Sequence, residues 1–298
     1  MPDKIKLKFL FVINPGSGNN NNKNWPELIK EYFASLTHVI ELFELTPDCD
    51  AGAIKKAITA FTPDRVVEVG GDGTIKLVAE CLLQKNIPIG ILPAGSANGL
   101  AKELGISDKP AEALAVLVEG ELKHIHVTKV NDHLCVHLSD IGFNAFLIKK
   151  FETQKRRGMW GYLKASVKVL FSNPTMQVRM EIDGQAVNIN AAMIVIANGT
   201  KYGSGAVINP IGNLEDELFE VIAIKKISLH EIYKMTFSHA DINPAKTEIF
   251  QTNSLTIRSK HRAHFKVDGE YLGKLYEVKA AIVTNALHMI VPRPESNT

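Results

Sequence analysis

Three glycine-rich turns in the first third of the chain constrain its fold more than any other sequence feature. They read NPGSG (residues 14–18), GGDGT (70–74) and LPAGSANGLA (92–101), and each follows an apolar segment with strand character. Glycines allow positive φ values and a close approach of backbone to ligand. A helix that begins at such a turn presents unpaired N–H groups that suit a phosphate. Three such turns at one sheet edge are harder to explain by turn formation alone than a single one.

The segments around these turns alternate between strand and helix patterns. The expected strands are 8–13, 38–45, 65–69 and 87–92, and the expected helices are 25–36, a stretch ending at 60, 75–83 and 97–104. This alternation predicts a parallel sheet covered by helices on both faces. Ligands bind to such sheets at the carboxyl ends of the strands.

The pattern becomes mostly β after about residue 125. Strands are expected over 125–136, 176–197, 218–224, 254–259, 263–267 and 278–284, with Asp183-Gly184 as a hairpin turn. Short strands with turn signals predict an antiparallel sandwich or barrel. We therefore expect a Rossmann-like α/β domain over residues 1–127 and a β-sandwich domain over 128–298. Whether the C-terminal segment returns to the first domain is left open.

Composition narrows the functional classes. The chain has 298 residues and a net charge of +2, which gives no case for bulk nucleic-acid binding. Cys49, Cys81 and Cys135 form no CxxC pattern, so a disulfide framework and a thiolate metal site are not expected, and a reducing cytosol fits best. No segment approaches the ~20 apolar residues of a membrane span.

Asp72 lies inside the GGDGT turn, where its carboxylate would stand beside any bound phosphate. Two anions repel each other, so an Asp at this place implies Mg²⁺, a proton to accept or a sugar hydroxyl. The alternative is an Asp that caps the following helix. The chain lacks GxxxxGK[ST], and GGDGTI is not GxGxxG, so neither a P-loop NTPase nor an ordinary dinucleotide fold is expected.

With these residues the chain resembles the diacylglycerol kinase catalytic-domain family, which includes bacterial lipid kinases, sphingosine kinases and ceramide kinases. The motifs occur in the family's order over nearly the whole chain: NPGSG, VVEVGGDGT, ILPAGSANGLAKELG, HLSDIGFNA, RRGMWGYLKA, NGTKYGSGAVINP, NLEDELFEV and VDGEYLG. GGDGT alone is shared with NAD kinases and phosphofructokinase-like folds. The resemblance implies a two-domain lipid kinase fold whose first domain is similar to those of NAD kinases and phosphofructokinases.

The resemblance also implies which residues bind ATP and accept a proton. The nucleotide would contact Asn14, Pro15, Gly16, Ser17, Gly18, Thr46, Gly70, Gly71, Asp72, Gly73, Thr74, Gly95, Ser96 and Asn98. Glu270 of VDGE matches the usual proton acceptor, with Asp72 as the second candidate; such a carboxylate must come within ~3 Å of the hydroxyl. The alternative for Glu270 is a solvated hairpin residue, because Asp-Gly-Glu is good turn sequence.

A structural Mg²⁺ is implied in the second domain. Asp216 would supply a carboxylate, and Asn213 and Leu218 would supply backbone carbonyls. Glu217 stands where the family usually has glycine, which leaves metal binding open. Asn98-Gly99 is closer to the sphingosine-kinase form than to that of the bacterial diacylglycerol kinases, so the acceptor lipid is also open.

These features predict a kinase that transfers the γ-phosphate of ATP, with Mg²⁺, to a lipid hydroxyl such as that of diacylglycerol or a sphingosine-like acceptor. The alternatives are a kinase for a soluble acceptor such as NAD, and a nucleotide-binding regulator without catalysis. The basic run 154–157 before Trp160 suits a membrane interface, or else a helix start with Trp160 packed inward. We expect a cytoplasmic protein that contacts the inner membrane face transiently to reach its lipid; a homodimer is left open.

Overall fold

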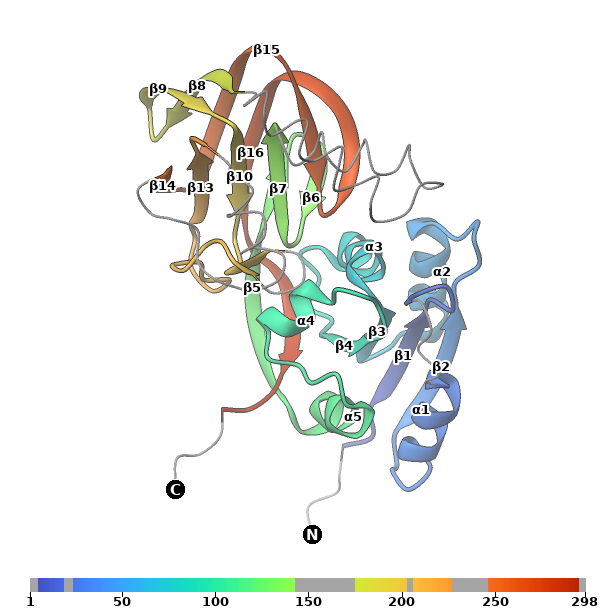
Figure 1. Ribbon diagram of the computed structural model, residues 1–298. Helices are drawn as coiled ribbons and strands as arrows, with labels where there is room; N and C mark the ends of the chain where they lie inside the picture. The colour runs from blue at the N-terminus through green and yellow to red at the C-terminus, as the bar shows by residue number, and fades with distance from the viewer. Residues whose placement is uncertain (1–4, 19–23, 143–174, 203–205, 227–245, 295–298) are drawn as a thin grey trace, which may run out of the picture. The chain divides into compact units, whose positions relative to one another are not determined.

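The structure is a computed structural model that describes residues 5–18, 24–142, 175–202, 206–226 and 246–294 (Figure 1). The chain forms two compact units. The first unit comprises Met1–Ile125 and Asn285–Thr298, and the second comprises His126–Thr284. Two paired strands, β5 (Glu121–Val130) and β16 (Glu270–Val291), continue from one unit into the other. The basic run 154–157 and Trp160 lie outside the described residues.

The first unit is built on the predicted parallel sheet. Its strands are β1 (Lys8–Ile13), β2 (Val39–Glu44), β3 (Arg65–Gly70) and β4 (Ile89–Pro93), in the order β4-β3-β1-β2. All three pairings between them are parallel. The far end of β16 adds a further parallel strand at β4, through Met289 and Ile89. β1, β3 and β4 are almost wholly buried, as expected for strands covered on both faces.

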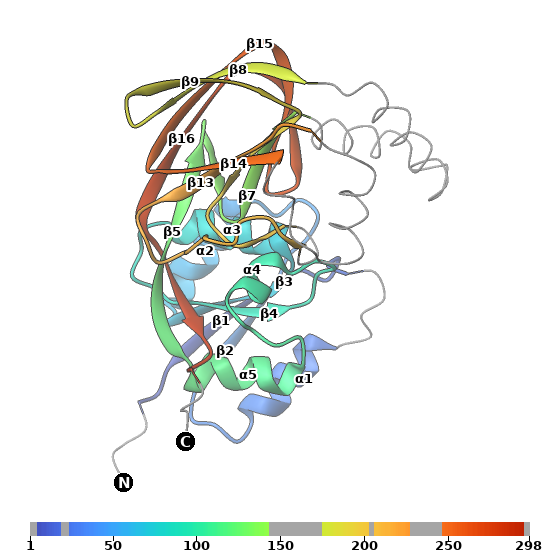
Figure 2. The ribbon, with the colours of Figure 1, turned by 60° about the vertical axis from the view of Figure 1, so that its left-hand side comes forward.

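Five helices of the described residues accompany this sheet. They are α1 (Trp25–Phe33), α2 (Ala51–Phe61), α3 (Asp72–Leu82), α4 (Gly99–Glu103) and α5 (Pro110–Glu119). Figure 2 shows α1 and α5 on one face of the sheet and α2 and α3 on the other. Asn24 and Asp50 cap α1 and α2 by accepting a backbone N–H. None of the helices in the described ranges has the length and apolarity needed to cross a bilayer.

Two helices differ from the sequence-based expectation. The helix expected over 97–104 is shorter, because Asn98 has a left-handed backbone (φ 52°) and the helix can begin only at Gly99. α5 was not expected, although proline at its first position is a favourable helix start.

The second unit is the predicted antiparallel β domain. With β5 and β16, its strands are β6 (His133–Cys135), β7 (Leu138–Gly142), β8 (Met176–Ile182), β9 (Gln185–Ala191), β10 (Met193–Ala197), β11 (Lys201–Tyr202), β12 (Ala206–Val207), β13 (Phe219–Ile224), β14 (Thr247–Thr252) and β15 (Ser254–Val267). The central order is β14-β13-β10-β7-β15, and β8 pairs with the other part of β15. Ile194, Ile196, Phe219, Val221 and Phe265 belong to its apolar core. Asp183-Gly184 forms the expected turn between β8 and β9.

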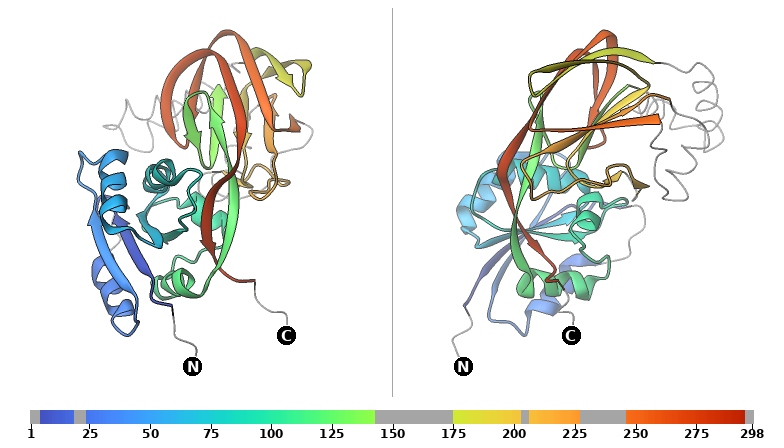
Figure 3. Two further views of the ribbon diagram at one scale, coloured as in Figure 1. Left: turned by 180° about the vertical axis from the view of Figure 1, so that it is seen from behind. Right: turned by 90° about the vertical axis from the view of Figure 1, so that its left-hand side faces the viewer.

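β15 and β16 are longer than the sequence pattern suggested. The segments expected as two strands, 254–259 and 263–267, are one strand of 14 residues. Its partner β16 has 22 residues, where only 278–284 was expected. The pairing passes from Arg258 with Glu277 to Ala263 with Leu275, so residues 259–262 stand opposite Tyr276 alone. This bulge lets the pair continue through a polar segment that reads as a loop. Figure 3 shows the two strands as long, curved orange and red ribbons.

Candidate functional site

The loops predicted to bind nucleotide meet at one edge of the first unit. Because its strands run parallel, the residues that follow them share the carboxyl edge of the sheet. Thr46 follows β2, Asn14 follows β1, Asp72 follows β3 and Ser96 follows β4. The structure therefore brings together every predicted nucleotide-site residue of this unit, which are Asn14, Pro15, Gly16, Ser17, Gly18, Thr46, Gly70, Gly71, Asp72, Gly73, Thr74, Gly95, Ser96 and Asn98.

Asn14 connects the first glycine-rich turn to the second. Its backbone N–H donates to the carbonyl of Val69 at 2.9 Å, and its side-chain Nδ2 donates to the Thr74 hydroxyl at 3.0 Å. Its Oδ1 accepts the N–H of Gly16 at 3.0 Å, which holds the first turn closed. All three polar groups have structural partners, so Asn14 fixes the spacing of the two turns.

The second and third turns touch through their glycines. The N–H groups of Ala94 and Gly95 both donate to the carbonyl of Gly70, each at 2.7 Å. A Cβ atom placed on Gly95 would lie 2.5 Å from the Cα of Gly71. Real Cβ atoms do not come so close to backbone, so glycine is required for this contact.

Asp72 connects the second turn to the helix after the third. Its Oδ1 accepts the N–H of Gly99 at 2.8 Å and that of Leu100 at 3.4 Å, so it caps α4. The sequence left open whether Asp72 caps the following helix, which is α3. No side chain among the described residues caps the start of α3. The N–H groups of Asp72 and Gly73 in the first turn of α3 are therefore available to an anionic ligand, whereas that of Thr74 donates to the carbonyl of Gly71.

Glu68 is a buried acid beneath these turns that sequence reasoning missed. It lies on β3 and is 1% exposed. Burial raises the pKa of Glu68 well above its usual range, and the negative charge of Asp72 acts in the same direction. A cavity of about 10 Å³, lined by Glu68, Gly70, Asp72 and Asn98 among others, has room for one water molecule. A single Glu in an apolar strand gave no signal of this position.

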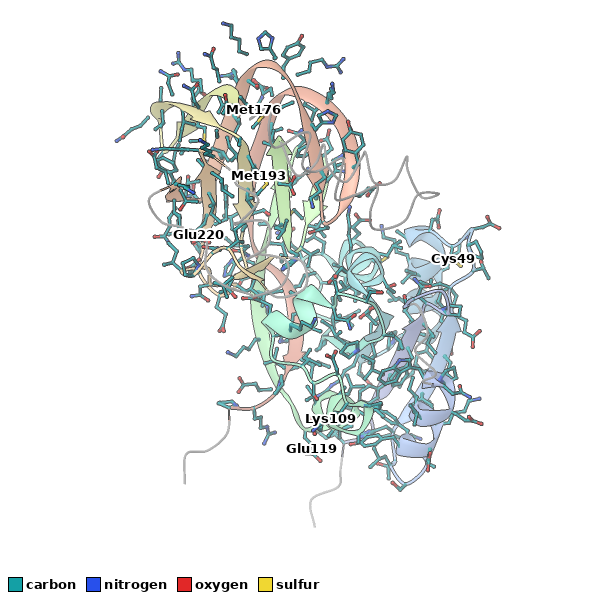
Figure 4. All side chains as sticks on the ribbon, in the orientation of Figure 1. Cys49, Lys109, Glu119, Met176, Met193 and Glu220 are labelled. Atoms are coloured by element: carbon teal, nitrogen blue, oxygen red, sulfur yellow. The ribbon has the colours of Figure 1, made fainter. Side chains whose placement is uncertain are left out.

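Thr46 lies in the loop between β2 and α2. The N–H of Leu45 donates to the carbonyl of Ile13 at 2.7 Å, which places this loop beside the first turn. The hydroxyl of Thr46 lies 3.3 Å from the Sγ of Cys49, which is labelled in Figure 4. Thr46 is exposed at this edge.

Glu270, the predicted proton acceptor, belongs to the second unit. It is exposed and begins β16, opposite Val267. Asp268 (φ 46°) and Gly269 (φ 86°) connect the two strands. Positive φ at both positions is typical of the tight type I′ hairpin. The hairpin expected from Asp-Gly-Glu is therefore present, and it fixes the backbone of Glu270.

Asp268 anchors this hairpin to the rest of the second unit. Its carboxylate accepts the N–H groups of Val136, His137 and Leu138 at 2.9, 2.9 and 3.1 Å. Its own N–H donates to the carbonyl of Leu138 at 2.9 Å. Burial raises the pKa of Asp268, and the three N–H bonds oppose that shift. Asp268 thus holds the turn from which Glu270 projects.

The predicted metal loop forms without glycine. Leu218 donates its N–H to Asp216 Oδ1 at 3.1 Å, and Glu215 donates to Asn213 Oδ1 at 3.0 Å. Glu217 is not among the residues with positive φ, so the turn tolerates a side chain there. The carboxylate of Asp216 and the carbonyls of Asn213 and Leu218 are hard oxygen donors of the kind Mg²⁺ prefers. The donor chemistry therefore fits Mg²⁺, although no group of three His, Cys, Asp or Glu gathers around one point in the described ranges.

Three further charged side chains, none of which the sequence indicated, are buried among the described residues of the second unit. Lys266 Nζ lies 3.0 Å from Asp140 Oδ2, and both side chains are almost fully buried. Glu220, labelled in Figure 4, accepts hydrogen bonds from Asn209 and, at 3.1 Å, from Gln251. Burial raises the pKa of Glu220.

A parallel sheet with glycine-rich turns at its carboxyl edge, followed in the chain by an antiparallel β unit, defines the class of GGDGT-type kinases. Residues 8–130 match the family described as "Diacylglycerol kinase catalytic domain". Residues 140–291 match the family described as "YegS C-terminal NAD kinase beta sandwich-like domain".

Two relatives that are similar in sequence and one solved structure that is similar in fold agree with these matches. The chain is 22% identical to "Diacylglycerol kinase" of Bacillus subtilis (strain 168), over 96% of each chain. It is 26% identical to "Probable lipid kinase YegS-like" of Chromohalobacter salexigens, over 76% of each. A crystal structure of a diacylglycerol kinase from Bacillus anthracis str. Sterne has the same fold, with a TM-score of 0.74 and 18% identity over 97% of this chain and 98% of that one. The chain belongs to the family of kinases that combine a diacylglycerol kinase catalytic domain with a YegS-type C-terminal domain.

Proposed function

We propose that this protein transfers the γ-phosphate of ATP to the hydroxyl of a lipid. The observation that carries the proposal is the connected set of turns at the sheet edge, where Asn14 and Asp72 join three glycine-rich segments. No side chain of the described residues caps the start of α3 at this edge. A nucleotide phosphate is the ligand that such an array of backbone N–H groups suits best. ATP use is also what a kinase family implies.

Within this proposal the chain's own residues bind and orient the nucleotide. The N–H groups of Asp72 and Gly73 in the first turn of α3 would donate to phosphate oxygens. Gly73 leaves space for the phosphates beside these N–H groups, because a Cβ atom there would meet nothing within 4 Å. Mg²⁺, when bound, would neutralise charge that develops on the transferred phosphoryl group.

Glu270 is the proposed proton acceptor for the lipid hydroxyl. Its exposed position on a hairpin fixed by Asp268 gives a carboxylate with a defined backbone and room for a substrate. Asp72 is the weaker candidate, because its Oδ1 already accepts two backbone N–H groups. We assign Asp72 the role of a positioning residue.

The lipid class of the acceptor is supported by the relatives. Their printed names are "Diacylglycerol kinase" and "Probable lipid kinase YegS-like". Diacylglycerol and sphingosine-like alcohols are therefore the first acceptors to test. The reaction would take place at the inner face of the membrane, where ATP and such lipids meet.

The test is an acceptor panel with labelled ATP and Mg²⁺ in detergent micelles. Diacylglycerol, monoacylglycerol, sphingosine, ceramide and phosphatidylglycerol serve as acceptors, and NAD is the soluble comparator. We expect one lipid to be phosphorylated, and Glu270→Gln to lower kcat by about 10²–10⁴-fold with little change in the KM for ATP. Formation of NADP without any lipid product would establish the soluble-acceptor alternative. ATP binding without turnover on any acceptor would favour a regulator.

A further inference from the structure

A basic groove lies on the outer face of the second unit. It has a volume of about 510 Å³ and is lined by Gln177, Arg179, Asn188, Asn190, Arg258 and Lys260, among others. These side chains share one face because alternate residues of β8 point outward: Val178 and Met180 are buried, whereas Arg179 is exposed. Cations and amide side chains therefore dominate the lining.

The cations of this groove are only partly neutralised. Arg258 and Arg179 are cross-strand partners, an arrangement in which like charges repel. Arg258 is balanced by Glu181 at 2.6 Å and by Glu277 at 2.7 Å. Arg179 and Lys260 have no carboxylate partner within the part of the chain that the structure describes. An anion in the groove would relieve this repulsion.

The bulge of β15 continues the basic surface beyond the groove. Lys260, His261 and Arg262 are exposed side by side. The guanidinium of Arg262 lies over the ring of Tyr276, 5.9 Å from its centroid, and Tyr276 is 60% exposed. Exposed tyrosine next to cations is typical of surfaces at a membrane interface, where the ring lies at headgroup level and the cations bind lipid phosphates.

We propose that this groove and the adjoining bulge dock on an anionic phospholipid surface, with Arg179 and Lys260 binding lipid phosphate groups. Charge complementarity selects this partner, since the surface offers cations, amide donors and an exposed aromatic ring. The inference rests on the proposed function in one respect, namely that the acceptor lies in a membrane. The inference specifies which surface of the second unit contacts that membrane. The residues of this surface take no part in the proposed nucleotide binding or proton transfer.

The experiment is vesicle flotation of the whole chain, with phosphatidylcholine vesicles that contain or lack phosphatidylglycerol. We expect binding only to the anionic vesicles, and a loss of binding as NaCl is raised. Each cation at such a surface contributes about 1 kcal/mol, so Arg179→Gln/Lys260→Gln should weaken binding about 30-fold. Lys30→Gln/Lys226→Gln removes the same charge from exposed positions outside the groove and should weaken it far less.

Three results would overturn the proposal. The first is equal binding of the protein to neutral and anionic vesicles, and the second is an equal loss of binding in the control variant. The third is displacement of the protein from anionic vesicles by millimolar inorganic phosphate at matched ionic strength, which would indicate a site for a soluble phosphate. Thermal melts of both variants verify that they are folded. In the micelle assay, which needs no bilayer docking, Arg179→Gln/Lys260→Gln should retain wild-type activity. If no acceptor is phosphorylated in micelles, the proposed function fails while the flotation result remains valid.

Discussion

Asp72 Oδ1 lies 2.8 Å from the backbone nitrogen of Gly99, so a residue of the second glycine-rich turn caps the helix after the third. Asn14 makes the corresponding connection between the first and second turns, through the Thr74 hydroxyl. Substitution of either residue should therefore affect all three turns together.

Replacement of Asp72 separates its structural role from its charge. Asp72→Ala removes the cap of α4 and should lower the free energy of unfolding by about 1–2 kcal/mol. Asp72→Asn keeps an oxygen that can accept the Gly99 N–H, so it should lose less stability. Both variants should weaken ATP binding, measured by calorimetry, with the Ala variant the weaker. Equal losses of stability in urea titrations would contradict the capping role.

A methyl group at Gly95 tests the contact between the turns. Gly95→Ala would place a Cβ 2.5 Å from the Cα of Gly71, so the loops must separate, at a cost of about 1–3 kcal/mol. Gly73→Ala is the matched control, because a Cβ there meets nothing within 4 Å. Gly73 lies in α3, where alanine should raise stability by up to about 1 kcal/mol. Melting temperatures that fall equally would refute the contact.

Glu68 should make stability depend on pH. Its pKa in the folded protein is raised by burial above the ordinary value of 4.5, so the unfolded chain releases this proton at lower pH than the folded protein does. Between those two pKa values, stability should fall with rising pH, by at most about 1.4 kcal/mol per unit. Glu68→Gln removes this decrease in the free energy of unfolding. The free energy of unfolding of the variant minus that of wild type should therefore increase from about pH 4.5 upward and then level off.

Urea titrations at a series of pH values measure this difference in the free energy of unfolding. Glu41→Gln, on the exposed part of β2, removes the same formal charge and serves as the control. A constant difference between Glu68→Gln and wild type across the series would show that Glu68 ionises equally in both states.

The first unit was largely predictable because its signals are local. The apolar run at 8–13 is β1 as expected, and the three glycine-rich turns lie where parallel strands end. Glu68 could not be placed in the same way, because a charged residue in an apolar strand reads as an outward-facing side chain. The nucleotide role of Asn14, Asp72 and their neighbours stays a prediction.

Asp268 should stabilise the hairpin that carries Glu270. Asp268→Asn replaces one carboxylate oxygen by an NH₂ group that must face a backbone N–H, so at least one hydrogen bond is lost, at about 1–3 kcal/mol. Asp183→Asn is the control: Asp183 occupies the same place in the β8–β9 turn, and Asn can still accept the Thr252 hydroxyl. We expect lower kcat only for Asp268→Asn. A similar loss in both variants would indicate a general effect on hairpins.

The buried pair of Asp140 and Lys266 should be costly to break. Lys266→Met leaves a buried carboxylate without its cation and should destabilise the protein by about 3–5 kcal/mol. Asp140→Leu/Lys266→Met removes both charges and should recover much of that loss. Denaturant midpoints of the three proteins measure the coupling, and additive losses would argue against a direct pair.

The second unit shows why long-range pairing is harder to predict. Asp140 and Lys266 lie on β7 and β15, and only the strand register brings them opposite each other. The bulge at 259–262 was expected as a break between two strands, because four polar residues carry no strand signal. Both features depend on pairing partners far apart in sequence, which local patterns cannot specify.

The return of β16 to the parallel sheet makes the first unit discontinuous in sequence. The β unit is, in topological terms, an insert between Ile125 and Asn285. An isolated fragment that stops near residue 127 would lack the strand beside β4 and expose an unpaired edge. Exchange of the β unit between relatives would accordingly need two crossover points in the gene, rather than the single junction that a tandem arrangement permits.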